Sequence, residues 1–145
     1  MRMDGADAIL PGGFWDADGR LHREAWLRPL TGREEELLAG AGAGSTAVAV
    51  TELLGRCLSR LGGLEPVPVD VVRGLLVADR EVLLLRLRQL TFGDQVSGDL
   101  ICPWPECGEQ VTLSFRLSEL PVQEPALRAP TYTVRLPGGP GSRTV

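Results

Sequence analysis

The chain has 145 residues, a length typical of one compact domain. Hydrophobic residues make up 43% and charged residues 23% of it, which is ordinary for a globular protein and excludes collagen, a coiled-coil rod and full disorder. The formal net charge is −4, and the 15 basic residues, all arginine, are scattered among 19 acidic ones. Because nucleic-acid binding needs clustered positive charge, a DNA or RNA partner is disfavoured.

Membrane insertion and export are also disfavoured by the sequence. No uncharged apolar run approaches the roughly 18 residues that a membrane-spanning helix requires. The first ten residues include Asp4 and Asp7 and have no apolar centre, so we do not expect a signal peptide. The sequence therefore predicts a soluble cytoplasmic protein with no membrane partner.

The first predicted elements are a flexible segment, a hairpin and a helix. Residues 1–13 are small and glycine-rich and are predicted to be a flexible lead-in. The Asp-Gly turn at Asp18 and Gly19 predicts a β-hairpin over residues 14–30, because glycine accepts the positive φ of a tight turn. Thr31 and Glu34 then fit a capping box, in which each side chain bonds the other residue's backbone N–H. This pattern predicts a helix over residues 32–39.

Three further helices are predicted before residue 95, and together with the hairpin they form a core region over residues 14–95. The second begins at Ser45 or Thr46 and ends before Gly62. Its inward positions follow a 3.6-residue period: Val48, Thr51, Leu54, Leu58 and Leu61. Asp70 and Asp79 are predicted to cap the third and fourth helices, the fourth covering residues 80–91. One face of the fourth helix carries Leu83, Leu84, Leu87 and Leu90.

A cysteine-tipped hairpin is predicted over residues 96–120. Apolar residues from Val111 to Leu117 alternate with polar ones, which is typical of a half-buried strand. Residues 121–145 are rich in proline and glycine and contain one short strand near Tyr132, which either pairs locally or begins a longer C-terminal portion. The predicted fold class is therefore α+β: an N-terminal β-hairpin, three to four helices, a zinc-knuckle-like hairpin and a short C-terminal strand.

Cys102 and Cys107 are the candidate metal ligands. An odd total of three cysteines argues against a disulfide framework. Two thiolates on a tight turn supply half of a tetrahedral zinc site, although four residues separate them instead of the usual two. Three interpretations stay open: a zinc site completed by Cys57 and His22 or by a second chain, a knuckle that no longer binds metal, and a redox-active pair.

Catalytic residues are harder to name than binding residues. His22 is the one histidine, Cys57 is predicted to be a buried helical thiol, and no set of nucleophile, base and orienting group is evident, so we do not expect an enzyme. Trp104 lies between two prolines on the predicted turn, where a rigid exposed aromatic side chain can anchor an interface. The candidate partner-binding residues are Leu83, Leu87, Leu90 and Trp104.

Four segments of the sequence occur in an order that resembles a known protein family. They are LTGREEELL over residues 30–38, DREVLLLRLR over residues 79–88, TFGD over residues 91–94, and the cysteine turn over residues 102–108. In this order they resemble the baseplate hub assembly chaperone family of contractile-tailed phages, and its relatives in phage-like contractile injection systems. The resemblance covers residues 14–137.

This resemblance implies a non-enzymatic protein that helps to build a contractile particle. Its implied partners are baseplate, hub, spike or tube proteins, with self-association as an open alternative. It would act in the cytoplasm, either as a transient chaperone or as a subunit incorporated into the particle. The family often carries a compact C-P-x-C-G knuckle, whereas the turn from Cys102 to Gly108 is longer. The competing hypothesis is a small zinc-knuckle adaptor, a protein-binding module unrelated to phage tails.

Overall fold

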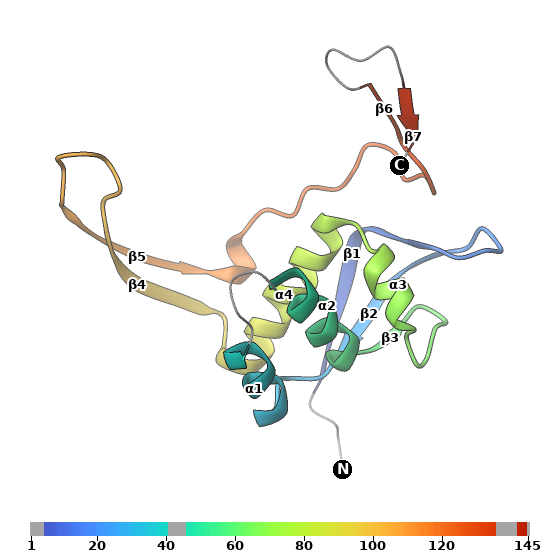
Figure 1. Cartoon of the computed structure of the whole chain (residues 1–145), viewed down its shortest axis with the longest axis horizontal. Coiled ribbons are helices and arrows are strands. Elements are labelled where there is room, and N and C mark those ends of the chain that lie inside the picture. The colour runs from blue at the N-terminus through green and yellow to red at the C-terminus, as the bar shows by residue number, and fades with distance from the viewer. Residues whose placement is uncertain (1–4, 41–45, 136–141, 145) are drawn as a thin grey trace.

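The computed structural model describes residues 5–40, 46–135 and 142–144 (Figure 1). In chain order the elements are β1 (Ala6–Trp15), β2 (Leu21–Leu27), α1 (Gly32–Gly40), α2 (Thr46–Cys57), β3 (Leu58–Leu61), α3 (Val69–Gly74), α4 (Val77–Phe92), β4 (Gln95–Ile101), β5 (Gln110–Arg116), the 3-10 helix η2 (Leu117–Glu119), β6 (Thr133–Arg135) and β7 (Ser142–Thr144). The predicted α+β class is confirmed. Ser45 as a helix cap, and the parts of the predicted terminal segments at residues 1–4, 136–141 and 145, lie outside the described residues.

The N-terminal hairpin forms around the predicted turn. The Asp16 carboxylate accepts hydrogen bonds from the backbone N–H groups of Asp18 and Arg20, at 3.0 and 2.8 Å. Gly19 has a φ of +75°, a conformation that glycine adopts without steric cost. Strand β3 then pairs antiparallel with β2, which gives a three-stranded sheet in the order β1-β2-β3.

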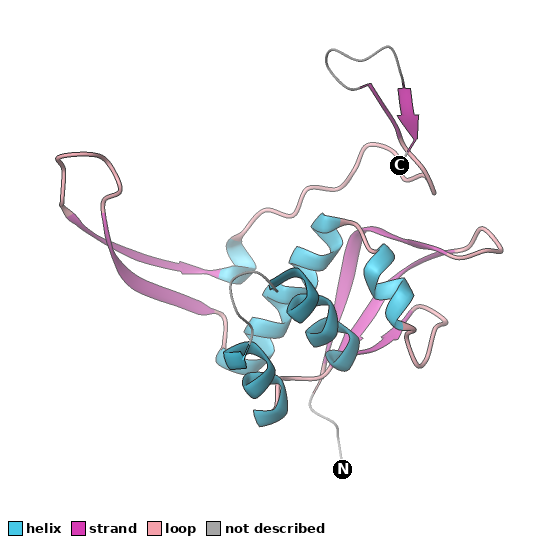
Figure 2. Ribbon diagram, in the orientation of Figure 1, coloured by secondary structure: helices cyan, strands magenta, loops and turns pink. Residues whose placement is uncertain are grey.

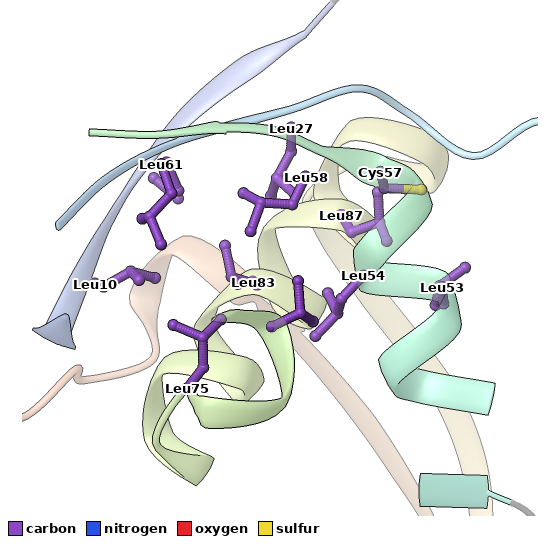
Figure 3. Close-up of a cluster of buried hydrophobic side chains, with 13 residues drawn as sticks. Leu10, Leu27, Leu53, Leu54, Cys57, Leu58, Leu61, Leu75, Leu83 and Leu87 are labelled. Atoms are coloured by element: carbon purple, nitrogen blue, oxygen red, sulfur yellow. The ribbon is translucent and has the colours of Figure 1, made fainter. Parts of the chain in front are cut away.

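The helices pack on one face of this sheet (Figure 2). Alternate side chains of the strands point toward them and meet the inward faces of α2, α3 and α4 in a single apolar cluster (Figure 3). Burying each such leucine contributes roughly 1.5–3 kcal/mol. The cluster consists of Ala8, Leu10, Ala25, Leu27, Leu53, Leu54, Cys57, Leu58, Leu61, Val72, Leu75, Leu83 and Leu87.

The prediction of a flexible lead-in is wrong for residues 6–13, which form most of β1. Leu10 in this stretch is wholly buried, and Ala8 is 8% exposed. The glycine-rich composition suggested a mobile segment, but the small residues let this strand lie close to α4. A Cβ atom at Gly12 would come within 2.5 Å of the Leu76 side chain. Small size at this position therefore reflects close packing.

A buried carboxylate joins α4 to the irregular middle of β1. The β1–β2 register shifts between Ile9 and Phe14. In that stretch the backbone N–H groups of Gly12 and Gly13 donate to the two carboxylate oxygens of Asp79, at 2.8 and 2.9 Å. Asp79 is wholly buried. Its predicted role as a helix cap is wrong, because α4 begins earlier, at Val77, and the Asp79 side chain serves the neighbouring strand instead of its own helix.

Two arginines satisfy the carbonyl groups of the same stretch. Arg23 Nε donates to the carbonyl oxygen of Leu10 at 2.7 Å, and Arg128 Nε donates to that of Pro11 at 2.8 Å. Both arginines also form ion pairs with Glu124. The C-terminal segment after η2 is therefore held against β1 by side-chain bonds to its backbone.

The second predicted helix ends early, and part of it is a strand. Leu58 and Leu61 are buried as the 3.6-residue period suggested, but they lie on β3. Val48, also predicted to face inward, is 69% exposed. The same leucines fit both a helical and an extended pattern, and pairing with β2 decides between them: Leu61 lies opposite Ala25. The third helix begins after Pro68, which occupies the cap position predicted for Asp70.

An ion pair between a buried glutamate and a half-buried arginine fixes the start of α1. Glu34, which is 2% exposed, accepts two hydrogen bonds from the Arg28 guanidinium at 3.0 and 3.1 Å. It also accepts the Thr31 backbone N–H at 2.9 Å, which confirms the glutamate half of the predicted capping box. The Thr31 hydroxyl donates to the same carboxylate. Arg28 first, and then Thr31, hold the pKa of Glu34 at about 2.

We predict that Asp79→Ala lowers the free energy of unfolding by about 2–4 kcal/mol, because it leaves two buried amide groups without acceptors. Urea unfolding followed by tryptophan fluorescence measures this change. Asp70→Ala is the matched control, since the Asp70 side chain is 85% exposed and its ion pair among the described residues is with Arg73 of its own helix. Equal stabilities of the two variants would show that the Asp79 contact is dispensable.

We also predict a pH-dependent contribution from Glu34. Its pKa in the folded state is about 2, below the ordinary value of 4.5, so folding favours the ionised carboxylate. The stabilisation is complete above pH 4.5 and is lost as the pH falls toward 2. The difference in unfolding free energy between the wild type and Glu34→Gln should therefore shrink over this range. Glu35→Gln, at an exposed position of the same helix, should differ little from the wild type at any pH.

Candidate protein-binding site

Strands β4 and β5 form a two-stranded antiparallel ribbon that extends away from the helical body (Figure 1). The ribbon follows α4 directly in sequence and returns to the body through η2. Among the described residues, no third strand joins this sheet. Its faces and tip are therefore open to solvent, as the exposure of most of its residues confirms.

One face of the ribbon is apolar. The register places Val96 opposite Phe115, Gly98 opposite Leu113, and Leu100 opposite Val111. Because side chains alternate between faces along a strand, these three pairs share one face. Leu100 is 54% exposed, Val111 43% and Leu113 41%. We call this set the apolar ribbon face: Val96, Leu100, Val111, Leu113 and Phe115.

The opposite face is mostly polar and is bonded across the two strands. Thr112 donates a hydrogen bond to the Asp99 carboxylate at 2.7 Å, and Gln95 donates to the Ser114 hydroxyl at 3.0 Å. These cross-strand bonds help to fix the register. A one-residue slip would place the apolar side chains on the polar face, so the register maintains an amphipathic ribbon.

A carboxylate clamps the base of the ribbon. Asp94 accepts hydrogen bonds from Gln89 of α4 at 2.7 Å and from the backbone N–H and hydroxyl of Ser118 at 2.9 and 2.6 Å. The bonds from Ser118, followed by the bond from Gln89, lower the pKa of Asp94. Arg88 adds bonds to the carbonyl groups of Gly93 and Gln95. Both chain crossings at the base are therefore tied to α4.

The tip of the ribbon presents a tryptophan. Trp104 is 75% exposed, and Ile101 beside it is 67% exposed. The turn closes through hydrogen bonds from Cys102 N–H to the Glu109 carbonyl and from Cys107 N–H to the Trp104 carbonyl, at 2.8 and 3.2 Å. The exposed position predicted for Trp104 is confirmed, while its role as a binding anchor stays a prediction.

The tip also carries Cys102 and Cys107, both with free thiols. Within the described parts of the chain, no three or more His, Cys, Asp or Glu side chains are grouped so that they could hold a metal ion. A tetrahedral zinc site needs four donors, and the described residues offer no such group around these two thiols, so zinc binding by Cys102 and Cys107 stays a prediction.

The other two ligands considered for zinc lie elsewhere. His22 bonds to Asp16 at 2.8 Å, and both residues flank the β1–β2 turn. Figure 1 shows this turn on the opposite side of the molecule from the tip of the β4–β5 ribbon. Cys57 is wholly buried in the core, and burial raises the pKa of its thiol to about 11. The structure thus separates these residues from Cys102 and Cys107.

The predicted partner-binding leucines of α4 belong to the core. Leu83 is wholly buried, Leu87 is 2% exposed, and Leu90 is half-buried against the same cluster. The prediction that Leu83 and Leu87 contact a partner is corrected, because the sheet already covers the α4 face on which they lie.

Comparison with known protein families matches residues 20–137 to the family described as T4 bacteriophage base plate protein. The chain belongs to this family. No curated protein and no solved structure matches it. In this baseplate protein, the matched segment includes β2, all four helices of the described chain and the whole ribbon. No helix in the described residues is both long and apolar enough to span a membrane.

The apolar ribbon face of this baseplate protein is not among the binding residues that the sequence predicts. The alternation in β5 was visible in the sequence, but it predicted a strand half-buried within its own chain. A second signal was available, since Val96, Gly98 and Leu100 alternate with polar residues in the same way. Two amphipathic strands flanking a short turn predict one apolar face, but they do not show that it faces solvent.

We predict that the three thiols divide into two classes. Cys102 and Cys107 lie on the projecting tip and should react promptly with a thiol reagent such as DTNB at pH 8. Cys57 should react only on unfolding, because it is buried and burial raises its pKa to about 11. The Cys102→Ser/Cys107→Ser variant should therefore show no prompt reaction. Prompt reaction of all three thiols in the folded protein would contradict the assigned burial of Cys57.

Proposed function

We propose that this chain is a non-enzymatic assembly or structural protein of a phage-tail-like contractile particle. It acts by binding another baseplate, hub, spike or tube protein through the β4–β5 ribbon. The main support for the proposal is the apolar ribbon face, which is exposed on an element that projects from a fully packed core.

The ribbon has the physical properties of a segment completed by a partner. A two-stranded ribbon alone in water is marginally stable, because its apolar side chains pack on nothing. Here the base is held by Asp94 and Arg88, while the apolar side chains remain exposed. Contact with an apolar surface on another protein would bury them and stabilise both partners. Membership of a baseplate family supplies a setting in which many proteins meet.

Three carboxylate side chains of the helical body and its hairpin turn have structural hydrogen-bond partners, which supports a binding role. Asp79 bonds two strand amides, and Glu34 bonds Arg28 and Thr31. Asp16 bonds His22 and its own turn, and these bonds, led by His22, lower the Asp16 pKa. Each carboxylate thus stabilises the fold or a turn.

We further propose that binding occurs while the particle is being built in the cytoplasm, since the segment order resembles that of hub assembly chaperones. A transient chaperone would leave after its partner reaches the particle, whereas a resident subunit would remain. Binding through the ribbon is compatible with both a transient chaperone and a resident subunit.

We predict that Trp104→Ala weakens binding to the partner by about 30-fold or more, as expected when an interface anchor is truncated. Leu100→Ser should also weaken binding, because it places a hydroxyl on the apolar ribbon face. Both variants should keep the wild-type melting temperature, since neither side chain contributes to the core. Binding is measured by biolayer interferometry against purified baseplate, hub, spike and tube proteins of the same particle, one at a time.

The matched control is Val48→Ser, which alters an apolar side chain that is 69% exposed on α2, an element outside the ribbon. It should bind as the wild type does. If Val48→Ser weakened binding while Trp104→Ala and Leu100→Ser did not, the contact surface would be on the helices and the ribbon proposal would be wrong.

A further inference from the structure

Apart from Arg116 at its base, the ribbon carries only negative charge. Between Gln95 and Phe115 the sequence has three acidic residues, Asp99, Glu106 and Glu109, and no basic one. All three are exposed. Two of them lie in the tip beside Trp104, and Asp99 lies on the polar face. The nearest arginines in the sequence, Arg88 and Arg116, are at the base.

The size of the ribbon restricts the shape of what covers it. A seven-residue strand is about 24 Å long, so one face of a two-stranded ribbon presents roughly 250 Å² in projection. A stable protein interface buries about 800 Å² on each partner. A flat surface placed on the apolar ribbon face alone therefore buries too little, while a groove that encloses the face, the edges and the tip approaches the required area.

The acidic tip and the small area of the apolar ribbon face together indicate what kind of partner surface covers the ribbon. This inference rests on the proposed function. We propose that the ribbon inserts into a groove of another baseplate protein whose floor is apolar and whose rim is lined with arginine or lysine. The floor receives Leu100, Leu113 and their neighbours on the apolar ribbon face. The basic rim meets Glu106 and Glu109 at the tip. Complementary charge of this kind accelerates association and selects the orientation of docking.

A second copy of the chain fits this ribbon less well. Two ribbons packed face to face with their tips together would bring Glu106 and Glu109 of both copies close to one another, and like charges across an interface oppose binding. The contact would also cover only one face of each ribbon.

The test is the salt dependence of association with purified hub, spike, tube and baseplate proteins of the same particle. For the protein that binds, the association rate of the wild-type chain should fall as NaCl rises from 50 to 500 mM. Glu106→Lys/Glu109→Lys should associate about tenfold more slowly at 50 mM NaCl, with a nearly unchanged dissociation rate, because rim charges act mainly on encounter. Its association should also lose the wild-type salt dependence.

The matched control is Glu35→Lys/Glu36→Lys, which makes the same change in net charge at two exposed positions of α1. It should keep the wild-type rate and salt dependence. Equal slowing by both double variants would show a general charge effect and overturn the basic groove. An unchanged rate for Glu106→Lys/Glu109→Lys, in a complex that Trp104→Ala still weakens, would overturn this inference and leave the proposed function standing.

Two other outcomes are decisive. Binding to none of the four kinds of protein would overturn the proposed function together with this inference. A dimer of the free chain in analytical ultracentrifugation, abolished by Leu100→Ser and by Leu113→Ser, would identify a second copy as the occupant and overturn the basic groove.

Discussion

The contact between Asp79 and the backbone of Gly12 and Gly13 is the constraint on which the arrangement of the molecule depends. Strand β1 departs from regular pairing in its middle, and the buried amide groups left there need acceptors. A carboxylate from α4 supplies them, which fixes the helix across the sheet. Arg23 and Arg128 bond the neighbouring carbonyl groups, so β2 and the C-terminal segment are joined to the same stretch.

The position of the ribbon follows from the position of α4. The helix ends at Phe92, and β4 begins only a few residues later. Asp94 ties that junction to Gln89 of the helix and to Ser118 beyond β5. A helix fixed near its start by Asp79 and near its end by Asp94 holds the ribbon base in place relative to the core. The ribbon is therefore oriented before any partner binds, which reduces the ordering cost of binding.

Local patterns predicted the turns, the start of α1 and the cysteine-tipped hairpin, because these depend on residues close in sequence. Contacts between distant segments could not be predicted in this way. The glycine-rich composition of β1 is typical of a flexible terminus, and only the distant Asp79 shows why this stretch is ordered. Leu58 fits a helical period, and only the pairing of β3 with β2 shows that it lies on a strand. Similarly, Leu83 and Trp104 were equivalent apolar candidates in the sequence, and only the packing of α4 on the sheet places the first in the core and the second on the surface.

We propose that the ribbon, held on a fully packed core, is the surface that binds a partner. Hydrogen–deuterium exchange of the chain, alone and bound to its baseplate partner, tests it most directly. In the free chain, amides of residues 95–116 should exchange much faster than those of β1, β2 and α4, since few buried contacts protect them. On binding, new protection should concentrate in residues 95–116. Protection that instead fell on the helices, with the ribbon still exchanging freely, would show that the ribbon is not the binding surface.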